Sequence, residues 1–245
     1  MSIKTFELIS TTENGIELIS YIALPENASD DNPVAGILVA PEWWGVVEHP
    51  KTITERLAKA GYAAVAMDVY GEGKLTSDAA MANMWMEQVL EDPDMLMARC
   101  RLILNDFSDQ LAVDGDKLAA IGYCFGGKVV LDMAREGMPL KAVATFHGDL
   151  TAKQPADKNF KAKVLVAHGR EDSMVTMDAI ENLKKELDTA EVDYTIDVYD
   201  DAKHGFTNPN ADERGAKNNV DLGYNETAAK QSWDNLLEFM TANLG

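Results

Sequence analysis

Residues 121–130 read IGYCFGGKVV and place a cysteine, Cys124, where a buried strand is about to become a helix. Gly122 and Gly126 stand two residues before and two residues after it. A strand that turns at once into a helix brings those two positions together, so side chains there would clash and glycine is needed. The residue at the turn points outward, at a helix N-terminus that stabilises a thiolate and can bind an oxyanion. The stretch therefore predicts a nucleophile elbow in an α/β fold, although free cysteines are often buried and inert.

The sequence on either side alternates predicted strands and helices. Residues 5–11 and 16–24 alternate apolar and polar side chains around an Asn-Gly turn, which predicts an antiparallel hairpin. Near-continuous apolar runs are typical of parallel strands covered on both faces, and they lie at 34–40, 62–70, 117–124, 141–148 and 163–169. Helical patterns lie at 49–60, at 76–111 with a break near Asp92-Pro93, and at 126–136, 176–189 and 226–243. We therefore expect a doubly wound, mostly parallel sheet.

The chain shows no internal repeat, low-complexity tract or Pro/Ser-rich linker, so a single domain over residues 1–245 is the simplest interpretation. The polar stretch 208–225 is expected to be a long loop before the last helix.

The charge of the chain limits its partners. Its 22 basic and 41 acidic residues give a net charge of −19 at pH 7, which repels phosphate backbones and anionic membrane surfaces. We therefore expect neither a nucleic acid nor a membrane as a partner.

The two cysteines, Cys100 and Cys124, have no framework of repeated spacings, and free thiols indicate a reducing compartment. The N-terminus has no basic region followed by an apolar stretch, and no segment is long enough to span a membrane. We expect a cytoplasmic protein.

Two residues at the ends of later strands could serve the thiol. Asp172 follows the predicted strand 163–168, and His204 follows the predicted strand 192–199. The order nucleophile, acid, histidine is that of α/β-hydrolases, and catalytic groups in open α/β sheets gather at the carboxyl ends of the strands. His204 would take the thiol proton and later activate water, while Asp172 would fix the tautomer of the imidazole.

Alternatives remain for each role. Glu171 is the main rival of Asp172. His49 is interpreted as a residue at a helix start, whereas His147 and His168 end buried strands and fit a structural or pocket-lining role as well as a catalytic one.

At this point the chain resembles the dienelactone hydrolase family. The resemblance rests on GYCFGG at the nucleophile, HGRED around the acid, AKHGF around the histidine and PEWWG after the strand 34–40. It implies a three-layer α/β/α hydrolase fold with the N-terminal antiparallel hairpin. It also implies a cytoplasmic monomer or weak homo-oligomer that cleaves small esters or lactones through a thioester, without metal or cofactor.

The resemblance assigns further residues. Glu42 in PEWWG matches the family glutamate that contacts the resting thiol, and an anion there disfavours the thiolate. The backbone N–H groups of Trp43 and Phe125 match the oxyanion hole. The alternative for Glu42 is an exposed loop carboxylate.

One departure concerns the substrate. The family enzymes hold a substrate carboxylate with two arginines, but the position four residues past His204 is Asn208, and no arginine lies between Arg56 and Arg99. Asparagine cannot replace the charge of a guanidinium clamp, so a dicarboxylate dienelactone is doubtful. Trp44, Trp85 and Asn208 are candidate pocket residues. The methionines around Trp85 are interpreted either as adaptable core or as an apolar pocket wall.

Two hypotheses follow. The first is carboxylic ester or lactone hydrolysis through a Cys124 thioester. The second is a non-catalytic or redox-sensing protein on the same fold, which would need only a reactive thiol.

Overall fold

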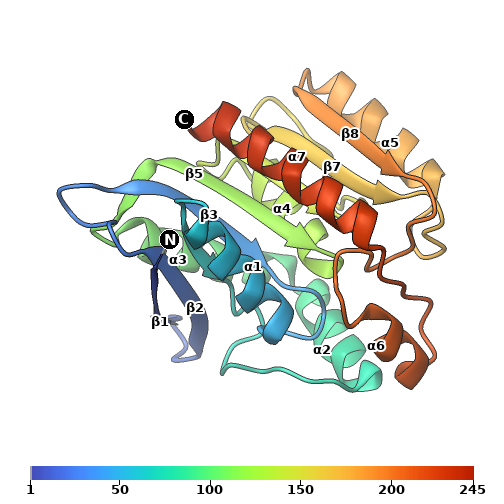
Figure 1. The fold of residues 1–245 in the computed structure, drawn as a ribbon, viewed down its shortest axis with the longest axis horizontal. Helices are drawn as coiled ribbons and strands as arrows, with labels where there is room; N and C mark the ends of the chain where they lie inside the picture. Colours follow the sequence, from blue (N-terminus) through green and yellow to red (C-terminus); the bar gives the residue numbers. More distant parts are fainter. Residues whose placement is uncertain (1) are drawn as a thin grey trace. The chain divides into compact units, whose positions relative to one another are not determined.

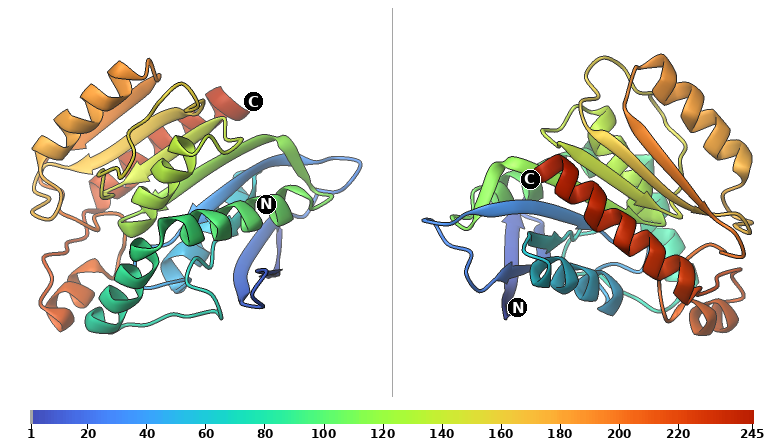
Figure 2. Two further views of the ribbon diagram at one scale, coloured as in Figure 1. Left: turned by 180° about the vertical axis from the view of Figure 1, so that it is seen from behind. Right: turned by 45° about the horizontal axis from the view of Figure 1, so that its top comes forward.

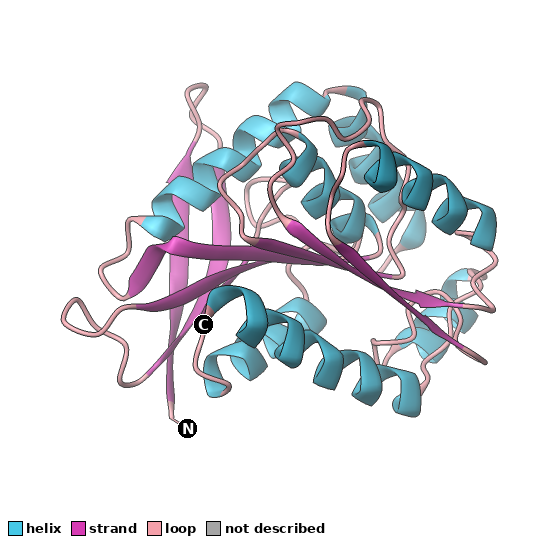
Figure 3. Ribbon diagram, turned by 90° about the horizontal axis from the view of Figure 1, so that it is seen from above, coloured by secondary structure: helices cyan, strands magenta, loops and turns pink. Residues whose placement is uncertain are grey.

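The computed structural model describes residues 2–245, which fold as two compact units (Figure 1). The first unit ends at Ala120 and the second runs from Ile121 to Gly245. In each unit the strands form a layer with helices on both faces (Figure 3). Among the described residues, no helix is both long enough and apolar enough to cross a membrane.

The first unit begins with the expected hairpin. Its elements are β1 (Ile3–Thr11), β2 (Glu17–Pro25), β3 (Val34–Ala40), α1 (Glu48–Lys59), β4 (Ala63–Ala66), α2 (Ala79–Glu91), α3 (Pro93–Ser108) and most of β5 (Val113–Tyr123). The strand order is β1-β2-β4-β3-β5. β1 pairs antiparallel with β2, β2 pairs antiparallel with β4, and β3 pairs parallel with β4. The hairpin therefore joins a parallel sheet at one edge, as predicted.

Helices α1 and α3 cover the two faces of this sheet. α1 buries Ile53 and Leu57, which are spaced four residues apart on one side of the helix, and contacts β2, β3 and β4. α3 contacts β1, β2 and β3. The predicted break before α3 is confirmed, because the Asp92 side chain caps the helix by accepting the Met95 N–H at 3.0 Å and Pro93 begins the helix.

The second unit contains three parallel strands and four helices among its described residues. These are α4 (Phe125–Arg135), β6 (Ala142–Phe146), β7 (Lys163–Gly169), α5 (Met177–Thr189), β8 (Tyr194–Tyr199), α6 (Ala211–Asn218) and α7 (Glu226–Leu244). β7 lies between β6 and β8 and pairs parallel with both. α4 and α7 pack on opposite faces of these strands (Figure 2). The parallel arrangement places the residues that follow β6, β7 and β8 at the same edge of the sheet.

Two expectations about element boundaries are wrong. The stretch 208–225 contains the helix α6, which is polar and buries only Ala211 and Gly215, so it lacks the apolar period that would have indicated it. The apolar run 62–70 forms a strand only over β4, because the chain turns at Asp68. The carboxylate of Asp68 accepts backbone N–H groups and organises this turn; the donors are Ile19, Tyr70, Gly71 and Gly73.

Candidate active site

The turn between β5 and α4 has the geometry of a nucleophile elbow. Cys124 adopts φ 54° and ψ −117°, a strained conformation for a residue with a side chain. A Cβ on Gly122 would collide with the carbonyl group of Gly126, so the predicted need for glycine at position 122 is confirmed. The Cys124 N–H donates to the Phe146 carbonyl at 3.0 Å, which ties the turn to the end of β6. The Cys124 side chain is partly exposed at the N-terminus of α4.

Asp172 and His204 form a buried pair in the same unit. Their side chains meet through Asp172 Oδ2 and His204 Nδ1 at 2.9 Å, and the residues are 4% and 3% exposed. The other carboxylate oxygen, Oδ1, accepts the N–H groups of Met174 and Val175, both at 2.9 Å. The carboxylate is therefore fixed on one side by the backbone and can hold the imidazole in one orientation on the other.

The charges at this pair favour an ionised acid and a protonated ring. Burial raises the pKa of Asp172, but His204 and the N–H groups of Val175 and Met174 outweigh burial and hold the pKa below its ordinary value. Burial lowers the pKa of His204, but the negative charge of Cys124 and the hydrogen bond and charge of Asp172 raise it to about 10. The protonated ring, bonded to the ionised Asp172, is therefore the stable form of His204 at neutral pH.

Cys124 acts on His204 through its charge and as a hydrogen-bonding partner, so the thiol and the imidazole lie close together. Within residues 2–245, the buried Nε2 atom of His204 has no hydrogen-bond partner of regular geometry. Such loose contact is common between a nucleophile and its base before substrate binds. The predicted three residues are thus brought to one place, whereas Glu171, the rival of Asp172, is exposed.

The other histidines of the second unit are buried beside this pair. Burial lowers the pKa of His168 and outweighs the opposing effects of the Asp172 charge and the Val175 backbone. His147 packs edge-on against the His204 ring with the centroids 5.2 Å apart, and its Nε2 lies 2.8 Å from the Thr207 hydroxyl. The sequence left the role of both histidines open.

Asn208, a candidate pocket residue, is 1% exposed. Its side-chain oxygen accepts the Asn210 N–H at 2.9 Å, and its own N–H donates to the Gly205 carbonyl at 2.9 Å. These contacts show that Asn208 shapes the loop that follows His204. A role in binding substrate stays a prediction.

The first unit holds the PEWWG residues. Glu42 is 5% exposed, so the alternative of an exposed loop carboxylate is wrong, and its Oε2 lies 3.5 Å from His49 Nδ1. His49 does lie in the first turn of α1, as predicted, but no pattern in the sequence indicates that it pairs with Glu42. Trp44 is 1% exposed and packs edge-on against Trp43 at 5.0 Å.

Trp85 lies on α2, and its ring is 5.9 Å from that of Tyr70. The Tyr70 hydroxyl donates to the Trp43 carbonyl at 3.0 Å, and Arg99 donates to the carbonyls of Val69 and Tyr70 at 2.9 and 2.8 Å. Arg99 thus holds the segment after β4. Among the methionines near Trp85, Met81 and Met84 are 42% and 43% exposed, so they are not core residues.

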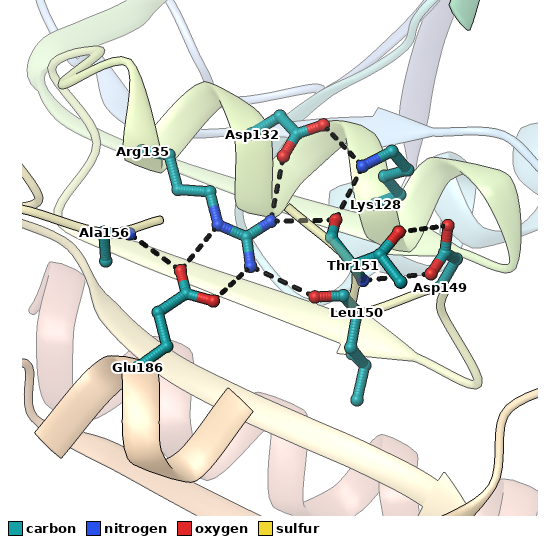
Figure 4. Close-up of polar contacts among 8 residues, drawn as sticks. All are labelled: Lys128, Asp132, Arg135, Asp149, Leu150, Thr151, Ala156 and Glu186. Atoms are coloured by element: carbon teal, nitrogen blue, oxygen red, sulfur yellow. Dashed lines mark hydrogen bonds and ion pairs between the residues drawn. The ribbon is translucent and has the colours of Figure 1, made fainter. Parts of the chain in front are cut away.

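A buried arginine in the second unit, which the sequence did not single out, ties α4 to α5 (Figure 4). Arg135 binds Glu186 through Nε and Nη2 at 2.8 and 3.0 Å, and Asp132 through Nη1 at 2.8 Å. It also donates to the Leu150 carbonyl at 3.1 Å, in the segment after β6. The contact therefore connects the helix that follows Cys124 with the helix that follows Asp172.

No group of three His, Cys, Asp or Glu side chains among residues 2–245 is arranged to hold a metal ion.

Known proteins resemble this chain along nearly its whole length. Residues 18–244 match the dienelactone hydrolase family. A proposed carboxymethylenebutenolidase of Yersinia pestis is 30% identical over 93% of this chain and 84% of its own, and one of Salmonella typhimurium is 29% identical over 95% and 85%. The crystal structure of a dienelactone hydrolase-like promiscuous phosphotriesterase from metagenomic libraries is 31% identical, covers 100% of both chains and superposes with a TM-score of 0.93. The family model matches nearly the whole chain, and the fold is shared over its full length. The chain therefore belongs to the dienelactone hydrolase family, and it is an ester or lactone hydrolase with the α/β-hydrolase fold.

Proposed function

We propose that the protein hydrolyses a small carboxylic ester or lactone through a thioester on Cys124, with His204 as general acid and base and Asp172 as its orienting partner. The observation that carries this proposal is the buried hydrogen bond of 2.9 Å between Asp172 and the His204 ring. The neighbouring Cys124 also raises the pKa of this ring. A thiolate that is paired with an imidazolium is a strong nucleophile at neutral pH.

In the first half of the reaction, the Cys124 thiolate attacks the carbonyl carbon and forms a tetrahedral oxyanion. The oxyanion collapses to the thioester, and the bond to the leaving oxygen breaks. The His204 imidazolium gives its proton to that oxygen, so the alcohol leaves neutral, or stays attached as a free hydroxyl if the substrate is a lactone.

The second half of the reaction begins after acylation has removed the negative charge of the Cys124 sulfur. Because the negative charge of Cys124 is one of the causes that raise the pKa of His204, acylation lowers that pKa and leaves a neutral imidazole. The neutral ring takes a proton from water as the water attacks the thioester. The acid product leaves, and the thiolate and imidazolium are restored, while Asp172 stays ionised throughout.

Backbone donors complete the proposal. The Phe125 N–H lies at the N-terminus of α4, where helix donors favour a developing negative charge. By the resemblance of PEWWG to the family motif, the Trp43 N–H is its partner in the oxyanion hole and Glu42 restrains the resting thiol. If so, Glu42→Gln should increase the rate at which iodoacetamide alkylates Cys124 at pH 7.

We propose a neutral substrate, because no arginine occupies the family position at Asn208 and Arg99 is engaged by two backbone carbonyls. A neutral phosphotriester is the second candidate, favoured by the 31% identity to the promiscuous phosphotriesterase. The same thiolate would then attack phosphorus in place of carbon.

The test uses p-nitrophenyl acetate and a neutral aryl phosphotriester with the full-length protein. The proposal expects a burst of nitrophenol followed by turnover of the acetate, and a loss of at least about a thousandfold in Cys124→Ala. Cys100→Ala is the matched control, because Cys100 is fully buried in α3 and should be dispensable for activity. Stoichiometric labelling of Cys124 without turnover of either compound would favour the redox-sensing alternative, and full activity in Cys124→Ala would exclude the mechanism.

A further inference from the structure

His147 occupies a backbone position that disfavours its own side chain. It directly follows β6, adopts φ 40° in the left-handed region, and is 0% exposed. Glycine is the relaxed residue for such a conformation, and the strain is of the kind that persists at functional sites. The next residue in this turn is a glycine, Gly148, but the strained position itself carries a histidine. A buried imidazole kept at a strained position indicates a use for the side chain.

The contacts of the His147 ring point to the loop that carries His204. Its Nε2 lies 2.8 Å from the hydroxyl of Thr207, three residues past His204. Its ring meets the His204 ring at 5.2 Å and 62° and the Phe206 ring at 5.3 Å and 78°, both edge-on. His147 is thus held by Thr207 on one side and packs against His204 and Phe206 on another.

The backbone of His147 is anchored at the elbow and at the neighbouring strand. Its N–H donates to the Ala167 carbonyl on β7 at 2.8 Å. The residue before it, Phe146, accepts the Cys124 N–H at 3.0 Å. The side chain therefore spans from the strand end that fixes the nucleophile to the loop that carries the base.

We propose that His147 is a positioning residue, which with the Thr207 hydroxyl keeps the His204 ring in its catalytic orientation after Cys124 has been acylated. This inference rests on the proposed thioester mechanism. While Cys124 is a thiolate, its attraction for the imidazolium helps to orient the ring. In the thioester that attraction is gone, and the bond from Nδ1 to Asp172 alone leaves the ring free to tilt about that contact.

The consequence is an uneven effect on the two half-reactions. Loss of the hydroxyl at position 207 should leave acylation near the wild-type rate and slow deacylation about tenfold, the effect of losing one hydrogen bond, which here acts on His204 through the His147 ring. A residue that served only the stability of the loop would affect both steps alike, or neither. A loss confined to the deacylation rate would therefore indicate that the Thr207 hydroxyl helps to position His204, and not only to stabilise the loop.

The experiment measures the burst rate and the steady-state rate of p-nitrophenyl acetate hydrolysis for wild type, Thr207→Val and Thr207→Ser. Thr207→Val keeps the shape and loses the hydroxyl, whereas Thr207→Ser keeps the hydroxyl. Thr54→Val is the control, because the buried Thr54 hydroxyl makes a comparable bond of 2.8 Å to the Pro50 carbonyl inside α1. Near-UV circular dichroism checks that each variant is folded.

We expect a normal burst with about tenfold slower turnover in Thr207→Val, recovery in Thr207→Ser, and wild-type rates in Thr54→Val. His147→Phe, which retains a ring but no nitrogen, should reproduce the effect of Thr207→Val. Wild-type turnover in folded Thr207→Val, or an equal loss in both phases, overturns the inference while the thioester mechanism stands. Wild-type protein that turns over the ester without any acylated Cys124 would instead overturn the proposed function.

Discussion

Replacing Arg135 with methionine removes a buried cation and leaves its anionic partners in place. The Arg135 side chain is 4% exposed, and those of Glu186 and Asp132 are 13% and 23% exposed. Burial lowers the pKa of the guanidinium, but Glu186 and Asp132 outweigh burial and raise it, so Arg135 is charged at all accessible pH values. Methionine fills most of the volume, so the change mainly strands the Glu186 carboxylate and the Leu150 carbonyl, whereas Asp132 keeps its ion pair with Lys128 at 3.1 Å.

Breaking a buried ion pair by removing one partner costs about 3–5 kcal/mol of stability. Because 1 kcal/mol shifts the Tm of a chain of this size by about 2–4 °C, Arg135→Met should lower the Tm by roughly 6–20 °C. Urea titrations followed by circular dichroism measure the free energy directly. The control is Arg170→Met, because Arg170 and its partner Asp200 have side chains 53% and 76% exposed, and such pairs contribute at most about 1 kcal/mol.

The double variant Arg135→Met/Glu186→Gln separates the ion pair from packing. The Glu186→Gln change removes the stranded charge, and the new amide oxygen could still accept the Ala156 N–H, which bonds the Glu186 carboxylate at 2.8 Å. The double variant should therefore be more stable than the sum of the single losses by at least about 1 kcal/mol. Strict additivity, or an Arg135→Met loss no larger than that of Arg170→Met, would refute the reasoning that this cluster holds α4 to α5 (Figure 4).

Three further predictions concern the elbow and its surroundings. Gly122→Ala should abolish ester turnover and lower the free energy of unfolding by at least about 3 kcal/mol, because the added Cβ collides with the Gly126 backbone. The control is Gly115→Ala, where the nearest atom to the added Cβ is 3.6 Å away. Urea titrations should show a loss of less than about 1 kcal/mol for this control. The pKa of Asp172 is lowered by folding, so its stabilisation is present above its unfolded pKa of about 3.9 and is lost as the pH falls through the folded value. The deficit of Asp172→Asn relative to wild type should therefore be constant above about pH 5 and shrink as the pH falls below about 4, and a deficit that stays constant down to about pH 3 would contradict this. Burial lowers the pKa of His168, so the unfolded chain binds a proton at a higher pH than the folded chain, and stability falls as the pH drops below about 6.5. His168→Leu should make the free energy of unfolding less dependent on pH in this range. An unchanged pH dependence in this variant would contradict the prediction.

The sequence predicted the features that depend on residues close together in the chain. The elbow follows from the spacing of Gly122, Cys124 and Gly126, since their geometry is local. The pairing of Asp172 with His204 was predictable because both follow parallel strands, whose ends share one edge of the sheet.

The features that the sequence did not predict depend on contacts between distant segments. Arg135 and Glu186 are separated by 51 positions, and His147 and Thr207 by 60, and no periodic pattern relates such pairs. The contact between Glu42 and His49 joins residues close together in the chain, but it was missed because a histidine in the first turn of a helix shows no sign of a loop carboxylate packed beside it. α6 was missed for a different reason, because a short polar helix has no apolar face.

The proposed mechanism depends on a covalent bond between the acyl group of the substrate and the sulfur of Cys124. The most direct measurement is mass spectrometry of the acylated protein. The protein is mixed with p-nitrophenyl acetate, quenched in acid within the burst phase and digested with a protease, and the masses of the peptides are measured. We expect one acetyl group on the peptide that contains Cys124, a longer-lived one in His204→Gln if any label forms there, and none in Cys124→Ala. Acetyl groups found on another residue, or an unmodified Cys124 in protein that is releasing nitrophenol, would contradict it.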